Sequence, residues 1–84
     1  MENVEVVIAP NPFVEQTKFE LKGVDNQRFK VQLVNLNGKK IREEIYYSNQ
    51  FIFERKNLPK GIYFFKIYNA DNSPVAVGKI YPTD

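Results

Sequence analysis

The side chains that most often carry catalytic chemistry are scarce in this chain of 84 residues. It contains no His and no Cys, which removes the commonest general base, the commonest zinc ligand and any thiolate or disulfide. A hydroxyl nucleophile would therefore need Lys or a carboxylate as its base. Nothing in the sequence that flanks Thr17, Ser48, Ser73 or Thr83 suggests such a pair, and we predict that the chain is not an enzyme.

The acidic residues do not form a recognisable site either. Glu43-Glu44 is an adjacent carboxylate pair, but neighbours on a strand point to opposite faces and cannot act on one substrate. The pairs Asp25-Asn26 and Asp71-Asn72 supply too few oxygens for a calcium loop and are typical of turns. The four glycines are too scattered for a phosphate-binding loop. We predict no metal site and no cofactor.

The charge balance argues against nucleic acid and against a membrane span. Twelve basic and ten acidic residues give a formal net charge of +2, which is a weak field. Basic residues approach aromatic ones at Gly38–Arg42 and Arg55–Asn57, as they do in single-strand binders, but the acidic residues dilute this signal. No apolar run reaches the roughly 18 residues that a transmembrane helix requires.

The apolar residues, which make up 43% of the chain, alternate or cluster in short runs and never follow a helical spacing. Turn residues separate these runs. A chain this short builds a single core, so we predict one all-β domain over residues 1–84, an antiparallel sandwich of two sheets. We place its seven strands near Val4–Ala9, Gln16–Leu21, Phe29–Asn35, Lys39–Tyr47, Gln50–Arg55, Ile62–Tyr68 and Val75–Tyr81.

The Asn37-Gly38 turn allows two registers, and a shift of one residue exchanges the faces of a strand. A two-residue loop sets Leu33 opposite Arg42. A three-residue loop, Leu36-Asn37-Gly38 with Gly38 in the left-handed region, sets Leu33 opposite Ile41 and thus pairs apolar with apolar. We predict the second register.

Ile62–Tyr68 is the most apolar segment and would promote aggregation on an open edge, so we expect a central strand. Leu58, Gly61 and Tyr63 precede or begin this strand with the spacing of a tyrosine corner, in which the Tyr hydroxyl bonds to upstream backbone. The alternative is an ordinary turn followed by a core Tyr.

Four features follow one another in a fixed order: Ala9–Phe13, Val31–Lys39, Leu58–Tyr63 and a last strand with Gly78-Lys79-Ile80. In this order the chain resembles the C-terminal sorting domain of the type IX, or Por, secretion system. The chain departs from the family at Tyr81–Asp84, where relatives often end in a short basic or apolar strand.

The resemblance implies an Ig-like sandwich of seven strands at the C-terminus of a secreted or cell-surface protein that passes transiently through the periplasm. It implies a non-catalytic sorting signal whose partners are the outer-membrane translocon, a sortase-like processing protease that commonly removes the domain, and an N-terminal cargo region of the same chain. Met1 would then begin a piece excised from a longer protein.

Eight residues match the family motifs and are interpreted as fold-specifying: Pro10, Asn11, Pro12, Asn37, Gly38, Leu58, Gly61 and Tyr63. The two prolines lack N–H donors, so the first strand stops pairing there and the chain either crosses between sheets or presents an open edge. Asn11, extended before Pro12, is expected to be exposed, and its role is either to serve this strand switch or to contact a receptor directly. Lys79 and Ile80 are the candidates for translocon recognition. A charge beside Val77 and Ile80 has to face solvent, which favours Lys79.

The runner-up function is an Ig-like module of a surface protein, either a spacer or an adhesive module such as one that binds carbohydrate. An exposed stripe formed by Tyr46, Tyr47, Tyr68 and Tyr81 would support that function.

Overall fold

The computed structural model describes residues 4–84, which form seven strands and no helix. Each strand lies within one residue of its predicted bounds at either end, so all seven predictions are confirmed. The strands are β1 (Glu5–Ala9), β2 (Gln16–Lys22), β3 (Phe29–Val34), β4 (Lys40–Tyr46), β5 (Gln50–Glu54), β6 (Tyr63–Tyr68) and β7 (Pro74–Ile80).

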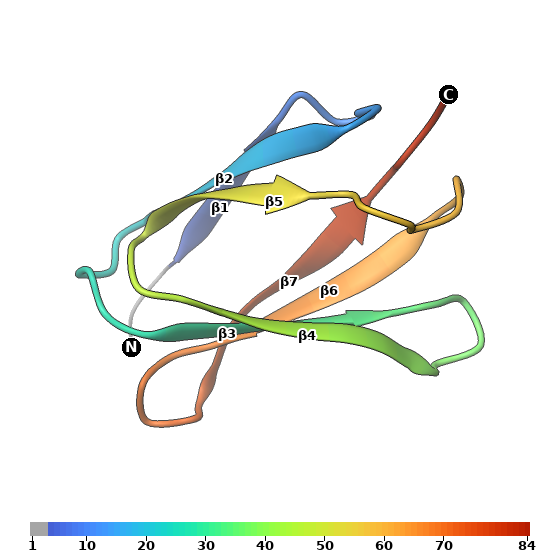
Figure 1. Ribbon diagram of the computed structural model, residues 1–84. Helices are drawn as coiled ribbons and strands as arrows, with labels where there is room; N and C mark the ends of the chain where they lie inside the picture. The colour runs from blue at the N-terminus through green and yellow to red at the C-terminus, as the bar shows by residue number, and fades with distance from the viewer. Residues whose placement is uncertain (1–3) are drawn as a thin grey trace.

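The strands form two antiparallel sheets packed face to face (Figure 1). One sheet has the order β1-β2-β5 and the other β4-β3-β6-β7. Strands one, two and five thus face strands three, four, six and seven, as in immunoglobulin-like domains. β6 lies between β3 and β7, which confirms the expected central position of the most apolar segment.

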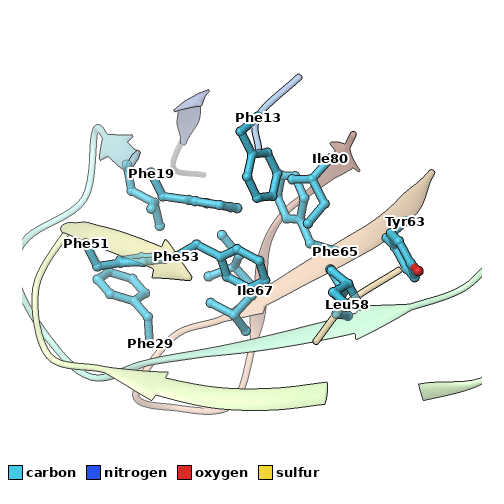
Figure 2. Close-up of a cluster of buried hydrophobic side chains, with 13 residues drawn as sticks. Phe13, Phe19, Phe29, Phe51, Phe53, Leu58, Tyr63, Phe65, Ile67 and Ile80 are labelled. Carbon is cyan, nitrogen blue, oxygen red and sulfur yellow. The ribbon is translucent and has the colours of Figure 1, made fainter. Parts of the chain in front are cut away.

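The core lies between the sheets and is built largely from phenylalanine (Figure 2). The Phe19 ring is central: it stacks on Phe51 from the neighbouring strand and meets Phe65 of the opposite sheet edge to face, with centroids 5.2 Å apart. Alternate residues of β2, β3, β5 and β6 are buried, which is the period-two pattern of strands with one buried face.

The β3–β4 hairpin has the predicted loop but not the predicted register. The Asn35 N–H donates to the Lys39 carbonyl at 3.0 Å, and Gly38 has a φ of 83°, so the three-residue loop Leu36-Asn37-Gly38 is confirmed. The pairing then shifts, because Val34 lies opposite Lys40 whereas Leu33 lies opposite Arg42. Ile41 is the extra residue of a bulge, and the predicted pairing of Leu33 with Ile41 is wrong.

The bulge turns Arg42, Glu44 and Tyr46 toward the sandwich interior and leaves Ile45 exposed. Two contacts with β5 explain why this register is favoured. Arg42 donates to the Glu54 carbonyl at 2.6 Å, and its guanidinium lies 5.0 Å from the Phe53 ring centroid. β4 and β5 are edge strands of opposite sheets, and inward-pointing polar side chains protect such edges from pairing with other chains.

The β6–β7 hairpin repeats this design. The Asn69 N–H donates to the Ser73 carbonyl, Asn72 has a positive φ of 62°, and the register shifts so that Val75 is the extra residue. The Oδ1 atoms of Asn35 and Asn69 each accept hydrogen bonds from the backbone N–H groups two and four residues later. An Asn at the start of the loop therefore orders both turns, and Asn37 contributes its backbone N–H to the first of them.

The tyrosine corner is present. The Tyr63 hydroxyl donates to the Pro59 carbonyl at 2.8 Å, and both Tyr63 and Leu58 are buried. Gly61 adopts a φ of 151°, a conformation that side-chain-bearing residues rarely adopt, and its N–H donates to the Pro82 carbonyl. The expected hydrogen bond is confirmed, so this segment is a tyrosine corner and not an ordinary turn followed by a core Tyr.

The Pro10-Asn11-Pro12 segment carries the chain from one sheet to the other. β1 pairs with β2 as far as Ala9, and Phe13 then forms a parallel bridge with Pro82 beyond the end of β7. The buried Thr17 hydroxyl donates to the Pro10 carbonyl and holds the crossing in place. The crossing between sheets is therefore confirmed.

Candidate functional site

The two residues proposed for recognition lie next to each other on β7 and point in opposite directions. The Lys79 side chain is exposed, whereas Ile80 is 0% exposed and belongs to the core between the sheets. A receptor cannot contact Ile80 in the folded domain, so we withdraw it as a recognition residue. Strand alternation explains the difference, because an outward Lys79 forces its neighbour inward.

Asn11 is half-buried, not exposed as expected. Its side chain bonds to the backbone of the β7 end: Nδ2 donates to the Lys79 carbonyl at 3.3 Å, and Oδ1 accepts from the Tyr81 N–H at 3.0 Å. Asn11 therefore fixes the backbone that presents Lys79. Of the two expected roles for this segment, these contacts support the structural one.

The Lys79 side chain lies over an aromatic ring on the outer face of the larger sheet. Its Nζ is 5.6 Å from the centroid of Phe64, the residue paired with it on β6. Around these two residues the sheet is hollowed by about 460 Å³. Val34, Phe64 and Val77 provide apolar lining, and Lys66 and Lys79 lie at this site as well.

Gly78 lies between Val77 and Lys79, and the structure explains its lack of a side chain. A Cβ atom at this position would lie 2.6 Å from the ring of Phe65, which is buried directly opposite on β6. Gly78 thus lets a central phenylalanine of the core pack against the edge strand.

The arginines in the two basic segments are used inside the molecule. Arg42 contacts β5 as described, and Arg55 donates to the carbonyls of Val14 and Leu58, both at 2.9 Å, and to that of Thr83. Arg55 therefore joins three chain segments at one end of the sandwich. Sequence reasoning missed both roles, although the positions of Arg42, Glu44 and Tyr46, two residues apart, are a detectable sign of a shared face.

Two ionisable side chains have shifted pKa values, and both shifts have local causes. Hydrogen bonds from Gln32 and Lys40 lower the pKa of the exposed Glu43 carboxyl. Burial and a hydrogen bond to Glu44 raise the pKa of the Tyr46 hydroxyl above its ordinary range. Glu43 and Glu44 thus engage different groups on opposite faces, as the alternation of β4 predicts.

The tyrosines named for a sugar-binding stripe do not share a surface. Tyr46 points inward, and its ring stacks on Phe51 with centroids 3.9 Å apart. Tyr47 is 76% exposed, whereas Tyr68 is half-buried with the Lys30 Nζ 4.8 Å from its ring centroid. The stripe that would support carbohydrate binding is therefore not formed.

Within residues 4–84, no group of three or more possible metal ligands lies together. In the same part of the chain, no helix is long and apolar enough to cross a membrane.

These features define a small immunoglobulin-like β-sandwich with a basic and partly apolar outer face on its four-stranded sheet. Residues 7–81 match the family model described as the secretion system C-terminal sorting domain. The chain belongs to this family and is a C-terminal sorting domain of the type IX secretion system. The protein that carries such a domain is secreted or displayed at the cell surface. No curated protein matches the chain.

Proposed function

We propose that this domain acts as a non-catalytic export signal for a cargo region that precedes it in the same polypeptide. Residues 1–84 would form one C-terminal domain of a longer secreted protein, which the outer-membrane type IX translocon recognises after transit through the periplasm. A sortase-like protease would then remove the domain. The match of residues 7–81 to the sorting-domain family is the observation that carries this proposal.

The folded sandwich is the form in which we expect the signal to be recognised. Motif residues far apart in the sequence meet only in the folded chain: Asn11 contacts Lys79 and Tyr81, and Gly61 contacts Pro82. An unfolded peptide would not hold these positions together. We assign Pro10, Asn11, Pro12, Asn37, Gly38, Leu58, Gly61 and Tyr63 to maintaining the fold.

Lys79 is the recognition residue that we propose. It is exposed, it lies on an edge strand, and it forms no ion pair within residues 4–84. Its carbonyl is fixed by Asn11 and its side chain lies over Phe64, so the ammonium group is held in a defined place.

The test is a fusion of residues 1–84 behind a periplasmic reporter enzyme that has its own N-terminal export signal. In a bacterium with the type IX machinery, the reporter is expected at the surface or in the medium. In an isogenic strain that lacks the translocon, it is expected to stay in the periplasm. Equal secretion by both strains would contradict the proposed route.

Point substitutions separate recognition from folding. Deleting residues 75–84 removes most of β7, buried Ile80 and the Pro82 bridge to Phe13, so loss of export in that deletion would not distinguish the two causes. Lys79→Ala is expected to leave stability within about 0.5 kcal/mol while it reduces secretion. Lys18→Ala, on the outer face of the other sheet, is the matched control. Normal secretion of the deletion would contradict the sorting role itself.

A further inference from the structure

The outer faces of the two sheets carry opposite charge. On the outer face of the four-stranded sheet, the described strands present four lysines and one glutamate, a net of +3: Lys30, Lys40, Lys66, Lys79 and Glu43. The three-stranded sheet presents two lysines and three glutamates on β1, β2 and β5, a net of −1: Lys18, Lys22, Glu5, Glu20 and Glu54. The whole chain, at +2, does not show this asymmetry.

The basic face also has an exposed apolar feature. Val77 on β7 is 69% exposed and lies opposite Lys66, and two residues further along the same strand is Lys79. Val34 and Phe64, which pair with each other on β3 and β6, line the hollow beside it. Exposure of this apolar surface to water is unfavourable, and a partner that covers it between the two cations would displace that water easily.

The positive charge on this face is available to a partner. Within residues 4–84, neither Lys66 nor Lys79 forms an ion pair, and Lys30 bonds to the neutral Asn72 amide. Glu43 is already engaged by Gln32 and Lys40. A carboxylate of a partner would therefore find unpaired ammonium groups with little competition from this sheet.

We propose that the outer face around Val77, Lys66 and Lys79 docks an acidic surface of a protein partner, one that inserts an apolar side chain flanked by carboxylates. Lys66 lies opposite Val77 on the neighbouring strand, and Lys79 lies about 7 Å beyond Val77 along β7. The partner's carboxylates therefore have to flank its apolar side chain with a similar spacing. The inference rests on the proposed sorting function and gives it a surface.

Charge and shape favour a protein over a glycan. Lys79 lies over the ring of Phe64 and Lys30 lies over the ring of Tyr68, so these two rings are not open for a sugar to stack on. The hollow itself is lined by Val34, Phe64 and Val77 beside the two lysines, a mixture typical of the centre and rim of a protein interface.

The test uses the reporter fusion with single substitutions in matched pairs. Lys66→Glu and Val77→Asp alter the proposed face, whereas Lys18→Glu and Ile52→Asp alter the opposite sheet, where Lys18 and Ile52 are paired neighbours. The first pair is expected to lower secretion at least tenfold, and the second pair to leave it within twofold. Lys66→Arg keeps the charge and is expected to restore secretion.

The outcomes separate the two proposals. If the unmodified fusion does not reach the surface through the type IX route, the sorting function fails and the docking surface fails with it. If it does, and all four variants are secreted alike or all four are equally impaired, only the docking surface is wrong. Thermal unfolding of each purified variant is measured first. Where charge reversal unfolds the domain, Lys66→Gln and Val77→Ser replace the reversed variants.

Vesicles test the competing source of negative charge. The purified domain is mixed with vesicles of phosphatidylcholine and phosphatidylglycerol, and separately with vesicles that contain lipopolysaccharide. We expect it to stay in solution with both. Co-sedimentation that Lys66→Glu abolishes and Lys18→Glu preserves would assign the face to a membrane surface and overturn the protein partner.

Discussion

The Asn11 Oδ1 atom accepts a hydrogen bond from the Tyr81 N–H at 3.0 Å, across 70 positions of the sequence. The same side chain donates to the Lys79 carbonyl. One side-chain amide thus bonds to two backbone groups with which a further β-strand would otherwise pair. The chain thereby protects the end of β7, an edge strand, with its own first crossing segment.

Removing this amide is expected to weaken the junction between the first and last strands. Asn11→Ala loses two hydrogen bonds and should lower the free energy of unfolding by about 1–3 kcal/mol. Urea denaturation measures the change. Asn11→Asp keeps the acceptor and loses the donor, so its loss should be smaller. Wild-type stability in Asn11→Ala would show that the bonds have no net effect on stability.

The tyrosine corner gives a second prediction. Tyr63→Phe keeps the ring in the core but leaves the Pro59 carbonyl without the hydroxyl donor, so we expect a loss of about 1–2 kcal/mol in urea denaturation. Tyr47→Phe is the matched control, because Tyr47 is 76% exposed. Equal stability of the two variants would mean that the corner does not stabilise the fold.

Each of the two hairpin loops has one residue with a positive φ, Gly38 or Asn72, and comparing the two loops predicts which residues that position tolerates. A Cβ at Gly38 would meet no atom within 4 Å, so substitution there costs only backbone strain. Gly38→Val should lower stability by about 1–2 kcal/mol, whereas Gly38→Asn should cost less, because Asn72 holds the matching position in the other hairpin. A Val variant as stable as the Asn variant in thermal unfolding would contradict this reading of the turn.

Tyr46 predicts a loss of stability in alkali. Burial, followed by the hydrogen bond to Glu44, raises the pKa of its hydroxyl above the unfolded value of about 10. The folded state then holds the proton more tightly, so this contribution is complete below pH 10 and is lost as the pH rises toward the folded pKa. Between pH 9 and 11, wild-type stability should fall more steeply than that of Tyr46→Phe. Parallel pH profiles from urea denaturation would refute the assignment.

Much of this protein follows from its sequence because the signals are local. Alternation of apolar residues placed seven strands to within one residue, and the Leu58–Tyr63 spacing predicted the bond from Tyr63 to Pro59. The Asn37-Gly38 pair predicted the loop and its positive φ. Each of these signals acts over a few residues, where backbone sterics and turn chemistry decide the outcome. The ordered motifs also sufficed to identify the family.

Tertiary structure decided what depends on distant partners. The bulge at Ile41 turns Arg42 inward, where it contacts the Glu54 carbonyl and the Phe53 ring of β5. Apolar matching within one hairpin could not reveal these contacts with another strand. The partners of Asn11 lie 68 and 70 residues away, and the charged face exists only when four separate strands lie side by side. Such contacts depend on sheet order and register, which single segments of sequence do not encode.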